Sequence, residues 1–159
     1  MTSSKTAVVT LPSDTDILIT REFDAPRHLV WRAWTTPELI KRWWGGDRGK
    51  VTLAEVDLRV GGAWRYVLIA NGDFEVGFHG EFREIVPQER IVNTEVYEAM
   101  PDEGSLCTVT FTEHDGRTTM EQLAHYPSKK IRELVIESGM ELGMQESMDA
   151  LEQVAISLR

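Results

Sequence analysis

The sequence predicts an α+β fold in which a curved antiparallel sheet of seven strands packs against one long C-terminal helix, with two short helices after the first strand. Two observations predict it. Between Val51 and His125, apolar and polar residues alternate and turn residues recur, which is typical of successive strands. After Pro127, apolar residues recur at helical spacing. The apolar face of the sheet and the apolar stripe of the helix must be buried against each other.

The first elements are a strand and two short helices. Residues 16–23 alternate weakly between apolar and polar and lie between prolines, which indicates a strand. Asp24 is the expected N-cap of the first helix, and Thr35 or Thr36 is that of the second. Pro37 in the first turn supports the start of the second helix, which a pair of glycines ends.

Six strands follow, and two of their turns predict a register. A three-residue loop at 70–72 sets apolar or aromatic residues opposite each other in three pairs: Leu68 with Phe74, Tyr66 with Val76, and Trp64 with Phe78. A two-residue turn at 115–116 gives three further inward pairs: Phe111 with Met120, Val109 with Gln122, and Cys107 with Ala124. The sheet is therefore expected to have one strongly aromatic face.

The C-terminal helical pattern begins at Ile131, is interrupted by Gly139 and continues to Leu158. Met144 and Met148 lie on its apolar stripe, and the opposite side is acidic and amide-rich. A curved sheet around one long helix tends to leave concave apolar space between them, where small ligands bind.

Composition and charge restrict the function. The chain of 159 residues is expected to form a single domain at 16–159 after a flexible leader at 1–15. Its net charge of −9 repels phosphate groups, so we expect no nucleic-acid partner. No apolar run is long enough to cross a bilayer, so no membrane partner is expected either. The single cysteine, Cys107, suits a cytoplasmic location, and the absence of metal and cofactor motifs predicts neither metal nor cofactor.

Four strings at residues 30–46, 56–66, 80–95 and 137–154 carry a family resemblance: VWRAWTTPELIKRWWGG, VDLRVGGAWRY, GEFREIVPQERIVNTE and ESGMELGMQESMDALEQV. With the order of elements, they resemble the START-like, or SRPBCC, superfamily, whose fold is called a helix grip. The subfamily they look like is similar to the C-terminal domain of the activator of heat-shock protein 90 ATPase. The resemblance implies a domain that in some members binds apolar small molecules. The chaperone activator has a further N-terminal domain outside this similarity, so chaperone activation is not carried over.

The candidate ligand-binding residues are the inward aromatic, methionine and amide side chains: Trp44, Trp64, Tyr66, Phe78, Phe111, Met120, Gln122, Met144 and Met148. We expect them to contact an apolar or amphipathic small molecule, which Tyr66 and Gln122 orient by hydrogen bonds. Core packing is the competing interpretation for the tryptophans and for the methionines.

Two alternative functions stay open. One is a protein-interaction module, such as a chaperone-linked one, built on an exposed collar of Trp44, Arg42 and Lys50. The other is a cyclase-type or hydrolase-type enzyme, which is disfavoured because the expected register brings no titratable side chain to the inner face. Thr94 is a further candidate for an inward polar group. We therefore expect no catalytic residue.

Overall fold

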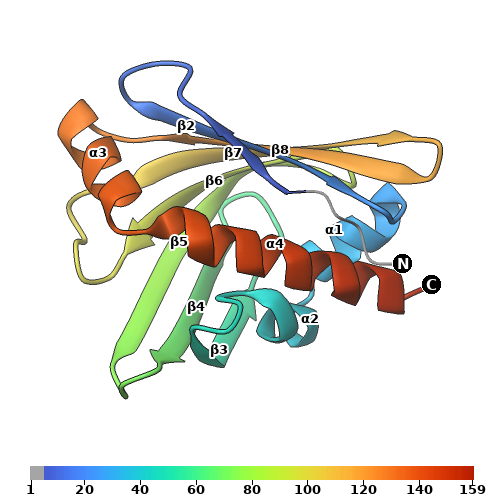
Figure 1. The fold of residues 1–159 in the computed structure, drawn as a ribbon, viewed down its shortest axis with the longest axis horizontal. Helices are drawn as coiled ribbons and strands as arrows, with labels where there is room; N and C mark the ends of the chain where they lie inside the picture. Colours follow the sequence, from blue (N-terminus) through green and yellow to red (C-terminus); the bar gives the residue numbers. More distant parts are fainter. Residues whose placement is uncertain (1–5) are drawn as a thin grey trace.

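The computed structural model describes residues 6–159 and has an α+β architecture with one curved sheet and four helices (Figure 1). In chain order the elements are β1 (Val8–Thr10), β2 (Asp16–Phe23), α1 (Arg27–Thr35), α2 (Pro37–Trp43), β3 (Gly49–Val56), β4 (Ala63–Ala70), β5 (Glu75–Val86), β6 (Arg90–Tyr97), β7 (Ser105–His114), β8 (Arg117–His125), α3 (Lys129–Glu137) and α4 (Met140–Ser157). The predicted fold class is confirmed. The strand order is β1-β2-β8-β7-β6-β5-β4-β3, and every neighbouring pair is antiparallel.

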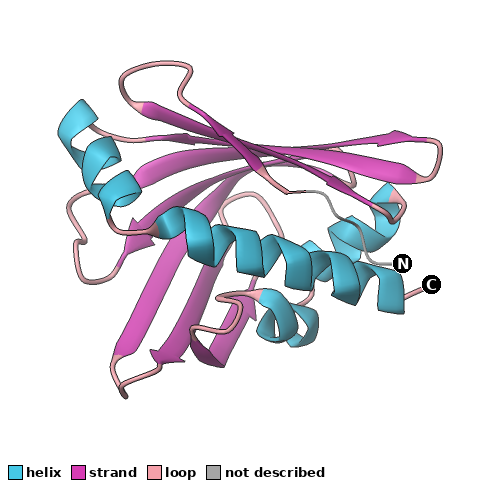
Figure 2. Cartoon of the chain, viewed as in Figure 1, coloured by secondary structure: helices cyan, strands magenta, loops and turns pink. Residues whose placement is uncertain are grey.

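The helices gather on the concave side of the sheet (Figure 2). The long helix α4 runs across this side, with α1 and α2 packed beside it and α3 at its N-terminal end. Phe23, Ile40, Met120 and Leu151 are fully buried between these layers. Within residues 6–159, no helix is long and apolar enough to cross a membrane.

The sheet has one strand more than the sequence predicts. Residues 8–10, which we assigned to the leader, form β1 and pair with β2, so that Val9 lies opposite Ile19. The backbone of Ala7 adds two hydrogen bonds to the Gln145 side chain on α4, at 2.9 and 2.8 Å. Three residues are too short for a periodic pattern, and for this reason the strand was not predicted.

One predicted hairpin register is confirmed and the other is wrong by two residues. The 115–116 turn gives all three expected pairs, with positive φ at both turn residues. In the other hairpin, Trp64 lies opposite Gly80, Tyr66 opposite Phe78 and Leu68 opposite Val76, because the loop is longer and leaves Phe74 exposed. A shift of two keeps every side chain on its predicted face.

Gly80 explains this register. The indole Nε1 of Trp64 donates to the Thr94 carbonyl at 3.2 Å directly across the glycine. A Cβ at position 80 would lie 2.6 Å from that nitrogen and 1.8 Å from the carbonyl oxygen, so only glycine fits there.

The helix boundaries follow the prediction, but one expected cap is wrong. The first helix begins at Arg27 with Pro26 at the N-cap position, so Asp24 is not its cap. Thr36 occupies the N-cap position of α2 without a side-chain cap bond, and Pro37 is in the first turn as expected. Gly139, with φ of 81°, separates α3 from α4.

A buried ion pair fixes α4 on the sheet. The Arg21 guanidinium on β2 donates to Glu152 Oε1 on α4 at 3.1 Å and to Asp149 Oδ1 at 2.7 Å. Glu152 Oε2 also accepts the backbone N–H of Asp24 at 2.9 Å. The side chains of Arg21 and Glu152 are 0% and 2% exposed, so each charge depends on the other for compensation.

We predict that Arg21→Met lowers the free energy of unfolding by about 3–5 kcal/mol, because it leaves the Glu152 carboxylate buried without its cation. Urea unfolding measures this change. The matched control is Arg59→Met, which breaks an exposed pair with Asp57 and should cost less than about 1 kcal/mol. Equal small losses in both variants would contradict the structural role of the buried pair.

Candidate functional site

A cavity of about 180 Å³ lies between the sheet and α4. Residues from the helices and from five strands of the sheet line it: Trp34, Trp43, Trp44, Trp64, Tyr66, Phe82, Asn93, Glu95, Cys107, Val109, Gln122, Met144, Ser147 and Met148. The cavity thus occupies the concave space that the sequence predicts between the aromatic sheet face and the methionine stripe.

Aromatic rings in mutual contact form one part of the wall. The rings of Trp34 and Trp43 stack with centroids 5.1 Å apart, and those of Trp64 and Tyr66 lie 4.8 Å apart. Trp44 packs edge-on against Tyr66 at 5.4 Å. The Trp43 indole N–H donates to the Ala33 carbonyl at 2.9 Å, which fixes that ring. These contacts hold the wall in place without a ligand.

Glu95 is the side chain that can place a charge in the cavity. It is the one lining side chain, in the described part of the chain, of the Asp, Glu, Lys, Arg or His type. The Cys107 thiol donates to its Oε2 at 3.8 Å, and no cation among residues 6–159 pairs with it. Burial raises the pKa of the Glu95 carboxyl above its ordinary value, and the thiol hydrogen bond offsets only part of this effect. The protein therefore favours the neutral acid at this position.

The neighbouring acidic groups are also held neutral. Burial raises the pKa of the Tyr66 phenol, and the charge of Glu95 raises it further. Burial likewise raises the pKa of the Cys107 thiol, with Glu95 again adding to the effect. A nucleophilic thiolate is therefore disfavoured at Cys107, and the cavity offers hydrogen-bond donors and one weak acid.

Most of the predicted ligand-binding residues line the cavity: Trp44, Trp64, Tyr66, Gln122, Met144 and Met148. Three do not. Phe78 lies behind the wall, between Trp44 and Tyr97, at ring distances of 5.7 and 5.1 Å. Phe111 and Met120 belong to the buried core, where Phe111 packs against Trp31 and Trp34.

Glu95 lines the cavity although it was not predicted to, and the prediction that Thr94 faces inward is wrong. In β6, Asn93 and Glu95 face the cavity, whereas the Thr94 hydroxyl faces away and accepts the backbone N–H of Glu81 at 2.9 Å. The expectation that no titratable side chain reaches the inner face is therefore wrong. Asn93 pairs directly with the inward Cys107, so the β6–β7 register would have revealed Glu95.

The loop that follows α2 packs tightly against α4. Gly46 has φ of 56°, and a Cβ there would lie 2.6 Å from the Cβ of Glu146. The Arg48 side chain donates to the Gly139 carbonyl at 3.3 Å. Glycine allows this close approach, which places the loop after Trp44 beside the α4 segment that contains Ser147.

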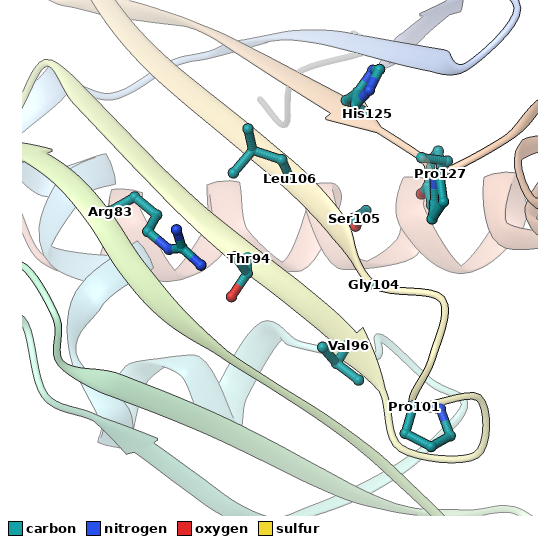
Figure 3. Close-up of a pocket in the computed structure, with 10 residues that line it drawn as sticks. Arg83, Thr94, Val96, Pro101, Gly104, Ser105, Leu106, His125 and Pro127 are labelled. Carbon is teal, nitrogen blue, oxygen red and sulfur yellow. The ribbon is translucent and has the colours of Figure 1, made fainter.

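A second concavity, of about 550 Å³, is an open groove on the opposite face of the sheet (Figure 3). Thr94, Leu106 and His125 line it, and all three alternate with inward residues of their strands. The His125 Nδ1 lies 2.6 Å from Asp16 Oδ1, so its imidazole is already paired. An open groove desolvates a ligand less than the inner cavity does. Within residues 6–159, no cluster of three metal-binding side chains is present.

Comparison with known proteins supports the fold. A family model described as Activator of Hsp90 ATPase homolog 1-like protein matches residues 24–155. A protein from Rhodobacter sphaeroides is 24% identical, with a TM-score of 0.88 over 96% of this chain and 99% of that chain. One from Nitrosomonas europaea is 24% identical, with a TM-score of 0.83 over 92% of this chain and 97% of that chain. No curated protein matches the chain.

We predict that Glu95→Gln stabilises the protein increasingly as the pH rises above about 4.5. A carboxyl with a raised pKa holds its proton in the folded state where the unfolded state has lost it, so wild-type stability falls as the pH rises through this range. The neutral amide removes that loss. Urea unfolding of both proteins across the pH range measures the difference.

The matched control is Glu98→Gln, whose effect on the free energy of unfolding is expected to have the opposite sign. Hydrogen bonds from Arg65 and His79 lower the pKa of Glu98 to about 2, so this carboxylate stabilises the fold above its ordinary pKa of 4.5. That contribution is lost as the pH falls toward 2. The difference in free energy of unfolding between the wild type and Glu98→Gln should therefore approach zero there. If the difference in free energy of unfolding between Glu95→Gln and the wild type does not grow with pH, burial of the Glu95 carboxyl is contradicted.

Proposed function

The chain belongs to the family of Activator of Hsp90 ATPase homolog 1-like proteins, and we propose that it binds a small apolar or amphipathic molecule in the cavity between its sheet and α4, without transforming it. The family's helix-grip fold is compatible with ligand binding and with protein interaction. The single observation that carries the proposal is the cavity between the sheet and α4, which five tryptophan and tyrosine rings and one carboxyl group line.

The cavity's volume restricts the ligand's size. A dry cavity of about 150 Å³ accommodates benzene, whereas sites for drug-sized molecules hold about 300–1,000 Å³. A volume of about 180 Å³ therefore suits a molecule the size of one or two small rings better than a long acyl chain. Glu95, Tyr66 and Gln122 would orient its polar end by hydrogen bonds.

Binding without transformation is favoured over catalysis. Covalent catalysis needs a nucleophile that an adjacent base or a lowered pKa activates. The side chain that Glu95 contacts is the Cys107 thiol, which burial keeps protonated. The cyclase-type or hydrolase-type alternative thus gains an acid in Glu95 but no activated partner for it.

The interaction-module alternative has less support. Arg42 and Lys50 are exposed, as a docking surface requires. Trp44, the aromatic member of the expected collar, instead turns inward against Tyr66 and Phe78. A partner would therefore meet a basic surface without its aromatic anchor. A cytoplasmic location stays part of the proposal and is supported by the buried, free Cys107.

We predict that indole or p-cresol stabilises the folded protein in a concentration-dependent manner, by about 2.7 kcal/mol at a hundred times Kd. Ser147→Phe should abolish this effect, because Ser147 lines the cavity and a benzyl group would fill it. Thermal-shift measurements test both statements.

The control for this experiment is Gln153→Phe, which places the same ring on the exposed side of α4. It should keep the full response to indole. A wild-type protein that neither compound stabilises, or a response that Ser147→Phe leaves intact, would contradict ligand binding in this cavity.

A further inference from the structure

We propose that the molecule bound in this cavity is a small organic cation, a substituted ammonium whose charge lies among the aromatic rings and against the Glu95 carboxylate. This inference rests on the proposed function, because it names the ligand class of the same cavity. The aromatic wall and the unpaired carboxyl carry it.

The wall has the composition of an aromatic cage. Four tryptophans and one tyrosine line a space of about 180 Å³: Trp34, Trp43, Trp44, Trp64 and Tyr66. The negative face of an aromatic ring attracts a cation, and tryptophan does so most strongly. Met144 and Met148 add polarisable thioethers from α4.

The carboxyl group lacks the cation that buried carboxylates normally have. The fully buried Glu152 has Arg21 at 3.1 Å, whereas Glu95 is partly buried at the cavity wall. Glu95 has only the Cys107 thiol within hydrogen-bond distance among the described side chains. A carboxylate out of water and without a counter-charge is costly. A ligand with a positive charge would therefore form the ion pair that no side chain of the protein forms with Glu95.

The volume of the cavity and the net negative charge of the protein both fit an organic cation. A trimethylammonium head group has about the bulk of a benzene ring, which a cavity of this volume can hold. The net charge of −9 also raises the local concentration of cations near the protein.

Binding of a cation should depend on pH, because Glu95 must ionise to pair with it. The groups that face Glu95 are Tyr66 from β4, Cys107 from β7 and Tyr126 after β8. None carries a positive charge, and α4 contributes only methionine and serine to the lining. Since burial raises the pKa of Glu95, affinity for a cation should rise as the pH increases through that pKa.

Choline and its uncharged isostere 3,3-dimethylbutan-1-ol (dimethylbutanol), which has carbon in place of nitrogen, have the same shape and differ in charge. Comparing their affinities therefore measures the contribution of the charge. By isothermal titration calorimetry at neutral pH, the wild-type protein should bind choline about tenfold more tightly than dimethylbutanol. Glu95→Gln should lose this preference by weakening choline and sparing dimethylbutanol. Glu98→Gln, which alters a partly buried carboxylate that pairs with Arg65 outside the cavity, should bind both compounds as the wild type does.

The outcomes also separate this inference from the proposed function. Equal or tighter binding of dimethylbutanol would overturn the cationic ligand while supporting an apolar cavity. Choline binding that Glu95→Gln leaves unchanged would overturn the role of the carboxylate. Binding of neither compound would overturn the cation inference, and the response to indole would then decide the proposed function independently.

Discussion

The ion pair between Arg21 and Glu152 joins β2 to α4, two elements whose paired residues lie 131 positions apart in the sequence. Neither side chain has water to solvate its charge, so the helix can shift only by breaking the pair. With α4 held on β2 in this way, its Met144–Met148 segment lies over strands β4 to β8 without filling the space between them. The cavity is therefore a consequence of where the helix is fixed.

Glu152, which is fully buried, and Glu95, which is partly buried at the cavity wall, have opposite environments. Glu152 accepts hydrogen bonds from Arg21 and from the Asp24 backbone, so its charge contributes to the fold. Glu95 receives one weak hydrogen bond from a thiol. A carboxyl kept without a cation inside an aromatic wall costs stability, and such uncompensated groups are typical of ligand sites.

The elements were predictable where the pattern is local. Alternation predicted β3 to β8, and the Asp115-Gly116 pair predicted a two-residue turn whose hairpin register the structure confirms. Alternation in β2 also places Arg21 on the inner face with Ile17 and Ile19, but its partner lies 131 residues away and no local pattern reveals it. Glu95 was missed because the long connection between β6 and β7 leaves their register undetermined by turn geometry.

The most direct test of this account is the titration of the Glu95 side-chain carboxyl by carbon NMR in the free protein, assigned with Glu95→Gln. The account predicts a midpoint above that of an ordinary glutamate, because the carboxyl lies in an aromatic cavity without a cation. A midpoint at or below the ordinary value would show the carboxyl in water or beside a positive charge. That result would contradict a cavity that holds the Glu95 carboxyl away from water and without a cation.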